Sequence, residues 1–164
     1  MHKGKYVFSQ LLDFLDRNDF NYLSRKHGGD KYVKPFTCYN QLCVLMFGQL
    51  SNRESLRDVV LATQAHASKA YHLGFGKHAA KSTLADANTK RDYRIFEEFA
   101  YKVIAEAQRC RIVDIFKLAG NVYAFDSTTV DLCLITFEWA LFRKKKGGIK
   151  MHTLYDLETQ IPTF

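Results

Sequence analysis

One carboxylate stands out in this chain because of the residues around it. Asp126 follows the apolar, β-prone residues 122–125 and precedes Ser127 and Thr128, so we expect it at the end of an apolar strand. A carboxylate in that place is costly unless it is paired, hydrogen-bonded or bound to a cation. Magnesium takes oxygen ligands, commonly one or two carboxylates together with phosphate oxygens. Asp126 is therefore a candidate magnesium ligand, with a hydrogen-bonded turn aspartate as the alternative. Asp131 is a second candidate, for which solvent exposure is the expected state.

A basic run follows downstream of Asp126. It consists of four consecutive cations: Arg143, Lys144, Lys145 and Lys146. Lysines in such a loop add salt-dependent, sequence-independent affinity for DNA phosphates, and a solvated loop without a partner is the alternative interpretation. Lys150 and His152 alternate in the strand that follows, so they share one face, which we expect to point toward DNA near Asp126. A structural histidine is the alternative for His152.

A second candidate interface lies in the helical part of the chain. Helical patterns over residues 54–66 and 82–90 flank a turn and suggest a variant helix-turn-helix, in which the second helix reads DNA. The separation exceeds the turn of about 3–4 residues in a standard motif, so plain packing of the two helices is the alternative. Ser82 and Thr83 at a helix start would meet a phosphate through free backbone N–H groups. The expected DNA contacts are Lys77, Lys81, Ser82, Thr83, Lys90 and Arg91.

The charge is distributed unevenly along the chain. Residues 1–121 hold 19 Lys and Arg against 12 Asp and Glu, whereas residues 122–164 hold five of each sign, so the net charge of +7 lies entirely in the first part. A basic unit beside a neutral segment suggests a polyanion as partner of the first part. A basic soluble protein without such a partner is the alternative.

Apolar periodicity predicts helices in the first three quarters of the chain. The expected stretches are residues 6–15, 37–50, 51–60, 81–88 and 92–111, with a looser segment at 27–35 and a turn at 71–76. Thr37 is the expected N-cap of the second helix. Ser51 and Glu54 have the spacing of a capping box that would start the third, and the fourth is expected to open with a capped start.

The pattern changes from helix to strand at about residue 120. Residues 122–125 are β-prone, residues 149–155 alternate at the strand period, residues 156–160 can turn, and residues 161–164 resemble the start of another strand. We therefore expect an α+β chain with a helical domain at 1–120 and a β segment at 121–164. The β segment is too short for an independent core, which indicates a truncated domain.

The composition excludes several classes of protein. Its 47% hydrophobic and 25% charged residues fit a globular chain and exclude general disorder. No stretch approaches the roughly 20 apolar residues of a membrane helix. Charges interrupt the apolar run behind the basic N-terminus, so it is no signal peptide. We expect a cytoplasmic protein with buried, reduced thiols and no zinc site, since no C-x-x-C pair occurs among Cys38, Cys43, Cys110 and Cys133.

Two runs together resemble the DDE transposases of bacterial insertion sequences, in particular the insertion sequence 4 type. In these enzymes a strand ends in the first catalytic acid within a motif like D-S-T, matched here by Asp126-Ser127-Thr128. A K-G-x-x-K-x-H strand follows, matched by residues 146–152. Residues 1–121 are similar to the helical N-terminal domain of uncharacterised function found in these transposases, through the segments 8–11, 42–50, 55–58 and 82–88.

The resemblance implies the N-terminal portion of a transposase. Residues 1–120 would form a DNA-binding or accessory domain, and residues 121–164 the first strands of a truncated ribonuclease-H-like catalytic domain. Asp126 matches the first of three acids that together hold two metal ions, and the chain ends before the expected second Asp and the Glu. Strand cleavage and joining need two metals about 3.5–4 Å apart, so we expect this chain to be inactive alone.

The resemblance also implies the partners and the cellular setting. We expect double-stranded DNA of the insertion-sequence ends as the ligand, association with the bacterial nucleoid, no membrane, and a homo-oligomer. Mg²⁺ is the cofactor expected of the complete enzyme, with weak or absent binding to this chain. A non-catalytic DNA-binding protein or regulator derived from a truncated transposase is the alternative, and a decayed gene product without function is a third interpretation.

Overall fold

The chain is α+β, with a helical N-terminal part and a small antiparallel sheet. The computed structural model describes residues 5–76, 79–110, 122–132, 141–143, 146–157 and 161–163, and the chain divides into two compact units, residues 1–101 and 102–164. The helical elements are α1 (Val7–Leu12), α2 (Arg17–Lys26), α3 (Cys38–Leu50), α4 (Leu56–Ala65), the 3₁₀ turn η1 (Ala67–Lys69), α5 (Lys81–Lys90) and α6 (Arg94–Cys110). The division falls within α6, and the boundary expected near residue 120 lies outside the described residues.

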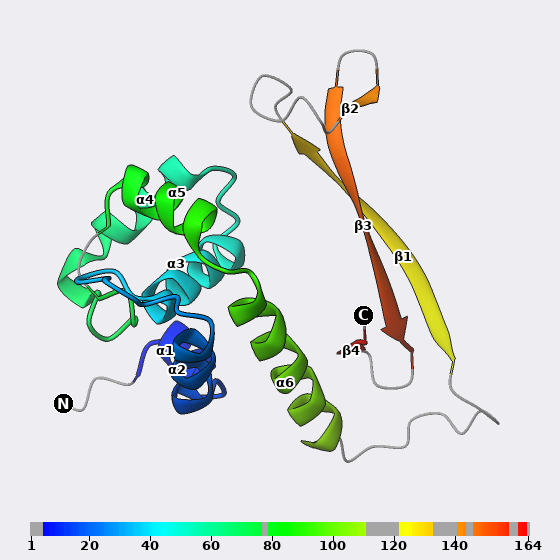
Figure 1. Cartoon of the computed structure of the whole chain (residues 1–164), viewed down its shortest axis with the longest axis horizontal. Helices are drawn as coiled ribbons and strands as arrows, with labels where there is room; N and C mark the ends of the chain where they lie inside the picture. The colour runs from blue at the N-terminus through cyan, green and yellow to red at the C-terminus, as the bar shows by residue number, and fades with distance from the viewer. Residues whose placement is uncertain are drawn as a thin grey trace. The chain divides into compact units, whose positions relative to one another are not determined.

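Helix α3 is the centre of the first unit. It packs against α2, α4 and α5, and it lies between α4 and α5 on one side and α1 and α2 on the other (Figure 1). Its start is the one expected: the Thr37 hydroxyl accepts the backbone N–H of Asn40 at 3.2 Å, and the Asn40 side chain accepts the Thr37 N–H at 3.1 Å. This reciprocal capping box satisfies N–H groups that a helix start otherwise leaves without a partner.

One predicted helix start is corrected by the structure. The Ser51–Glu54 capping box is wrong, because the Ser51 hydroxyl donates to the Phe47 carbonyl at 2.6 Å and Ser51 ends α3. Asn52 then takes a positive φ of 51°, which stops the helix. Ser55 caps α4 instead, accepting the Asp58 N–H at 3.2 Å. The spacing S-x-x-acid occurs twice in succession, and the copy that directly precedes the apolar periodicity is the one used.

The N-terminal segment differs from the predicted single helix over residues 6–15. Helix α1 ends at Leu12, and Asp16 starts the unpredicted helix α2 by accepting the N–H groups of Asn18 and Asp19 at 2.7 and 3.2 Å. A carboxylate at an N-cap stabilises the helix start, so the chain breaks and restarts there although apolar residues continue through the break. Helix α6 agrees with its prediction, with Ile95 and Phe99 buried.

Aromatic side chains fill the core of the first unit. Phe20 is fully buried, and its ring lies 5.0 Å from Phe99 and 5.8 Å from both Tyr39 and Phe96, measured between ring centroids. The rings of Phe20 and Phe99 meet edge to face, the arrangement that aromatic quadrupoles favour. This cluster joins α2, α3 and α6 within the helical unit.

The cysteines agree in part with the expectation of buried thiols. Cys38 and Cys43 are fully buried in α3, and burial raises the pKa of the Cys43 thiol to about 11. Cys110 is exposed, so the prediction is wrong for it, since the last turn of α6 faces solvent there. Cys133 lies outside the described residues. Of the helices that the structure describes, none combines the length and the apolar character that a membrane crossing requires.

The second unit contains a twisted antiparallel ribbon (Figure 1). Its long strands are β1 (Tyr123–Leu132) and β3 (Lys146–Asp156), paired so that Tyr123 lies opposite Asp156. The short strands β2 (Leu141–Arg143) and β4 (Ile161–Pro162) also pair with β3. The strands expected from the alternation over 149–155 and at residue 161 are therefore confirmed. Both faces of the ribbon carry exposed apolar side chains, among them Phe125 and Met151.

Candidate nucleic-acid interface

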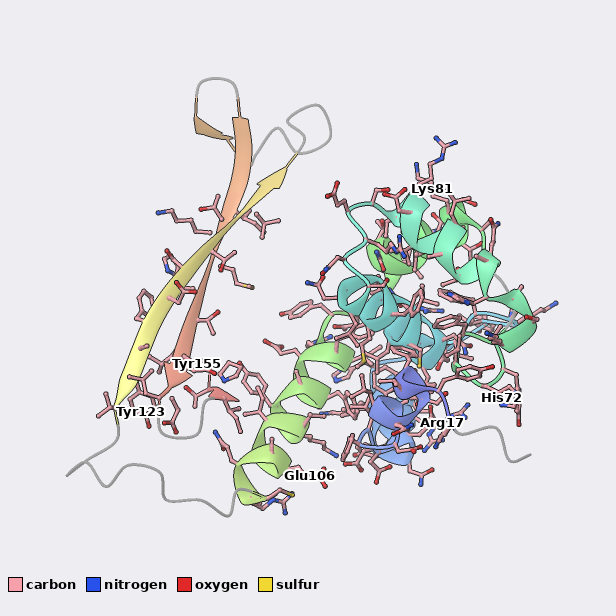
Figure 2. All side chains as sticks on the ribbon, turned by 180° about the vertical axis from the view of Figure 1, so that it is seen from behind. Arg17, His72, Lys81, Glu106, Tyr123 and Tyr155 are labelled. Atoms are coloured by element: carbon pink, nitrogen blue, oxygen red, sulfur yellow. The ribbon has the colours of Figure 1, made fainter. Side chains whose placement is uncertain are left out.

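Helix α5 presents a polar, basic face to solvent. Leu84 and Ala87 are its buried residues, and the helical period leaves the predicted DNA contacts on this helix exposed: Lys81, Ser82, Thr83 and Lys90. Figure 2 labels Lys81 at the end of the helical unit opposite to Arg17. A face of lysines and hydroxyl groups on an amphipathic helix can contact DNA phosphates without burying apolar surface.

The start of α5 lacks the predicted side-chain cap. Ala80 occupies the N-cap position, and no side chain of the described residues hydrogen-bonds there. The first helical hydrogen bond runs from the Leu84 N–H to the Ala80 carbonyl at 3.1 Å. The N–H groups that precede Leu84 therefore add partial positive charge beside the Lys81 ammonium, which favours an anion.

Helices α4 and α5 pack against each other and against α3, as a helix-turn-helix variant requires. The connection between them contains η1 and the predicted turn at 71–76, which is confirmed. The Asn40 side chain donates to the Gly74 carbonyl at 2.9 Å and so attaches this turn to α3. The turn is thus held by the same helix on which α5 packs. DNA reading by α5 stays a prediction.

Arg91 occupies a structural position, although the sequence predicts it as a DNA contact. Its guanidinium donates to the carbonyl of Thr37 at 3.1 Å, to the Gln41 side chain at 2.8 Å, and to the carbonyl of Phe36. The buried Gln41 side chain in turn donates to Asn88 at 2.6 Å. Arg91 therefore links the end of α5 to the start of α3, and its removal would leave partly buried acceptors without a donor. We omit it from the interface for this reason.

Lys90 and Lys81 are the cations of α5 that stay available to a ligand. Lys90 lies 3.6 Å from Asp86, an exposed ion pair one helical turn away. Exposed pairs of this kind contribute little, so the Lys90 ammonium can exchange Asp86 for a phosphate at small cost. Lys77, Lys144 and Lys145 lie outside the described residues.

Asp126 lies in the middle of β1, so the expectation that it ends a strand is wrong. The strand continues to Leu132 because the β-branched residues 128–130 favour extended backbone. The Asp126 carboxylate is exposed and accepts the N–H of Ser127 at 2.8 Å. It is exposed and hydrogen-bonded, so it needs no cation to offset burial.

The strand register separates Asp126 from the predicted cations. Asp126 lies opposite Thr153, whereas His152 lies opposite Ser127 and Lys150 opposite Thr129. Because paired residues share a face and successive residues alternate, Lys150 and His152 share one face of the ribbon and Asp126 lies on the other. The His152 ring stacks on Phe125, with centroids 5.1 Å apart and planes 11° apart. The ribbon therefore does not bring these three predicted residues together.

The described residues do not form a two-metal site. Besides Asp126, its face of the ribbon carries the hydroxyl groups of Thr128 and Thr153 but no second carboxylate from β1 or β3. Nor do the described parts of the chain contain a group of three or more His, Cys, Asp or Glu able to hold a metal ion. One exposed carboxylate does not fix two ions beside a phosphate, so we derive no cleavage step through magnesium.

The basic run includes the end of β2 and the start of β3. Arg143 is the last residue of β2 and Lys146 the first of β3, and the two residues pair. The expectation of a loop is therefore wrong for these two residues. Contact of the run with phosphates stays a prediction.

Sequence reasoning missed a cleft in the helical unit. It has a volume of about 560 Å³ and lies between the loop at 27–36 and α5 with the two residues that follow it, Arg91 and Asp92. The loop contributes Lys31 and Phe36 to its lining, and α5 contributes Thr83, Asp86 and Lys90. A lysine and a tyrosine at 31 and 32, shortly after the glycine pair at 28–29, were the available signal in the sequence.

Comparison with known proteins bears on the first part of the chain. Residues 3–76 match the domain of unknown function DUF4372, a domain found at the N-terminus of transposases. The matched segment contains α1 to α4 and η1, and it ends before α5. No curated protein and no solved structure matches the chain. The finding supports the N-terminal part of the resemblance, whereas the DDE catalytic part stays a prediction.

Proposed function

We propose that this chain acts in DNA transposition as part of a transposase, with the helical unit binding the ends of a bacterial insertion sequence. The match of residues 3–76 to a domain found at the N-terminus of transposases carries this proposal. The net charge of +7 confined to residues 1–121 supports a polyanionic ligand for the same part of the chain. Double-stranded DNA at the bacterial nucleoid is the proposed partner, bound by a homo-oligomer.

The contacts proposed for the helical unit come from α5. Lys81 and Lys90 neutralise phosphates, and the backbone N–H groups at the start of the helix, beside Ser82 and Thr83, donate to a further phosphate oxygen. These contacts set the affinity and the orientation of the protein on the duplex, while side chains of the helix that reach base edges set the sequence preference. The basic run at 143–146 and the Lys150–His152 face are proposed as additional DNA contacts of the second unit.

Asp126 is proposed as one acid of a magnesium site whose other acids lie outside the described residues. This part of the proposal rests on the resemblance of the D-S-T and K-G-x-x-K-x-H runs to DDE transposases. The exposure of the Asp126 carboxylate is compatible with a ligand role, because the oxygen atoms are accessible to a hydrated ion.

Selection of bound DNA from a random duplex pool tests the proposal. The full chain is expected to enrich one sequence, and that sequence should occur as inverted repeats on both sides of the reading frame that encodes the chain. Such a location identifies element ends directly. Enrichment of a sequence absent from both flanks, or no enrichment beyond a selection without protein, would contradict the function proposed here.

A non-catalytic DNA-binding protein is the second candidate. The observation that favours it is the single carboxylate on the Asp126 face of the ribbon, since two-metal catalysis needs several converging acids. Such a protein would occupy the same element ends and block a complete transposase. Both candidates share the binding prediction and differ in DNA cleavage.

The 164-residue chain is expected to leave supercoiled plasmid DNA intact in the presence of Mg²⁺ or Mn²⁺. The described residues supply one of the carboxylates that the reaction requires, so neither the wild-type chain nor Asp126→Asn should produce nicked circles on a gel. DNA binding should be unchanged by Asp126→Asn, because the carboxylate is exposed and far from α5 in the sequence. Metal-dependent nicking by the wild-type chain that disappears in Asp126→Asn would reveal an active metal site and exclude the non-catalytic candidate.

A further inference from the structure

The loop at 27–36 holds a tyrosine in a backbone conformation that favours glycine. The Val33 N–H donates to the Asp30 carbonyl at 3.2 Å, which makes Tyr32 the third residue of a four-residue turn, and its φ is +62°. Glycine or asparagine normally occupies that place when φ is positive, and a bulky side chain there is strained. The ring gains no burial in return, because Tyr32 is 92% exposed.

The loop is fixed rather than loosely attached. The Asp30 carboxylate accepts the Ser24 hydroxyl from α2 and the Cys38 N–H from α3, each at 2.7 Å. At Gly29 an added Cβ would lie 2.4 Å from the Ile95 side chain, so the loop backbone touches α6. The backbone that carries Tyr32 is therefore fixed, so a ligand that stacks on the exposed ring does not have to order the loop.

Two exposed lysines line the cleft beside Tyr32. Lys31 and Val33, the chain neighbours of Tyr32, line it while Tyr32 itself does not, and the Lys31 ammonium is 5.4 Å from the centroid of the Tyr32 ring. Lys90 lines the cleft from α5 and forms an exposed ion pair at 3.6 Å with Asp86, another lining residue, which it can exchange for a phosphate at small cost. The remaining charged groups at the cleft are engaged. Asp92 is bound by Arg94 at 2.9–3.0 Å, which lowers the pKa of its carboxyl to about 2, and His27 lies 2.8 Å from Glu98.

We propose that this cleft binds one unpaired nucleotide of DNA, with the base stacked on the Tyr32 ring and the phosphate between Lys31 and Lys90. The inference rests on the proposed DNA binding and specifies its substrate as duplex DNA that contains an unpaired nucleotide. A volume of about 560 Å³ suits a ligand of nucleotide size. Stacking on an aromatic ring tolerates any base, while Thr83 and Asp86 supply a hydroxyl and a carboxylate for the base edge.

The test compares two DNA ligands for the full chain by fluorescence anisotropy. One is a perfect duplex, and the other is the same duplex with one extra, unpaired 2-aminopurine nucleotide near its centre. The wild-type chain is expected to bind the second duplex about 5- to 100-fold more tightly, the range that one stacked base supplies. Quenching of the 2-aminopurine fluorescence on binding reports the stacking directly.

Three variants separate stacking from folding. Tyr32→Phe keeps the ring and should keep the preference, whereas Tyr32→Gly should abolish it. Glycine adopts a φ of +62° without strain, so Tyr32→Gly is expected to leave the melting temperature nearly unchanged. Tyr71→Ala is the matched control, since it removes a tyrosine that is 90% exposed and whose neighbours in the chain, Ala70 and His72, do not line the cleft, and it should keep the preference.

The outcomes distinguish this inference from the proposed function. Equal binding of both duplexes by the wild-type chain, or a preference that survives in Tyr32→Gly, overturns the nucleotide site and leaves duplex binding standing. Binding confined to the duplex with the unpaired nucleotide supports the site and contradicts the proposed binding of a perfect duplex by α5. The absence of binding to either ligand overturns both.

Discussion

Replacing Lys81 and Lys90 together by alanine is expected to weaken duplex DNA binding by about 30-fold at 0.15 M salt and to make its salt dependence less steep. Each phosphate contact contributes about 0.9 to the slope of log Kobs against log salt, so two lost contacts reduce the slope by about 1.8. Both side chains are exposed on α5, and the exposed pair of Lys90 with Asp86 does not stabilise the fold appreciably. Fluorescence anisotropy titrations between 0.05 and 0.2 M salt measure both quantities. In the upper part of this range the Debye length is about 8–10 Å.

A charge-matched variant serves as the control. Lys5→Ala with Arg25→Ala removes one cation two residues before α1 and one from α2, and these two helices lie on the other side of α3 from α5 (Figure 1). This variant should retain the wild-type slope if α5 forms the interface. An equal loss of slope in both variants would show that the affinity follows overall charge and not the α5 face. Arg91, which the sequence placed in the same DNA-binding set, is left unchanged because its loss would destabilise the helical unit.

Phe20→Ala is expected to destabilise the helical unit by about 3–5 kcal/mol, the usual cost of removing a fully buried phenylalanine ring. Phe20 is fully buried and contacts the rings of Phe99, Tyr39 and Phe96, so no side chain can relax into the cavity without breaking another ring contact. A natural domain is stable by about 5–15 kcal/mol, so this loss leaves little stability. Chemical denaturation followed by far-UV circular dichroism gives the free energy of unfolding.

Phe14→Ala is the matched control for this prediction. It removes the same ring from a position that is 78% exposed, and surface substitutions change the free energy of unfolding by about 0.5 kcal/mol or less. Comparable losses in Phe14→Ala and Phe20→Ala would mean that the Phe20 cluster is not the core of the helical unit. A small loss of unfolding free energy in Phe20→Ala would lead to the same conclusion.

Local signals in the sequence predicted the elements whose ends they control. Thr37 is the N-cap that the sequence predicts, and the apolar face of α6 and the alternation in β3 follow their periods. These signals arise from residues close together in the sequence, so each segment by itself contains what determines its secondary structure. Errors arose where two local signals competed, as at Ser51 and Ser55, or where an N-cap interrupted a continuing apolar pattern, as at Asp16.

By itself the sequence determined the α+β class, the basic character of the first part, and the residue types available for DNA contact. The tertiary structure alone decided which of these residues are available for DNA contact. Arg91 differs from Lys90 because carbonyls of residues 36 and 37, distant in the chain, come within reach of its guanidinium. Asp126 is separated from His152 because strand pairing sets the register, and a shift of one residue would reverse every face. Tyr32 became a candidate ligand-binding residue through a turn held by Ser24 and Cys38. In each case long-range packing, which no local pattern encodes, selects the partner.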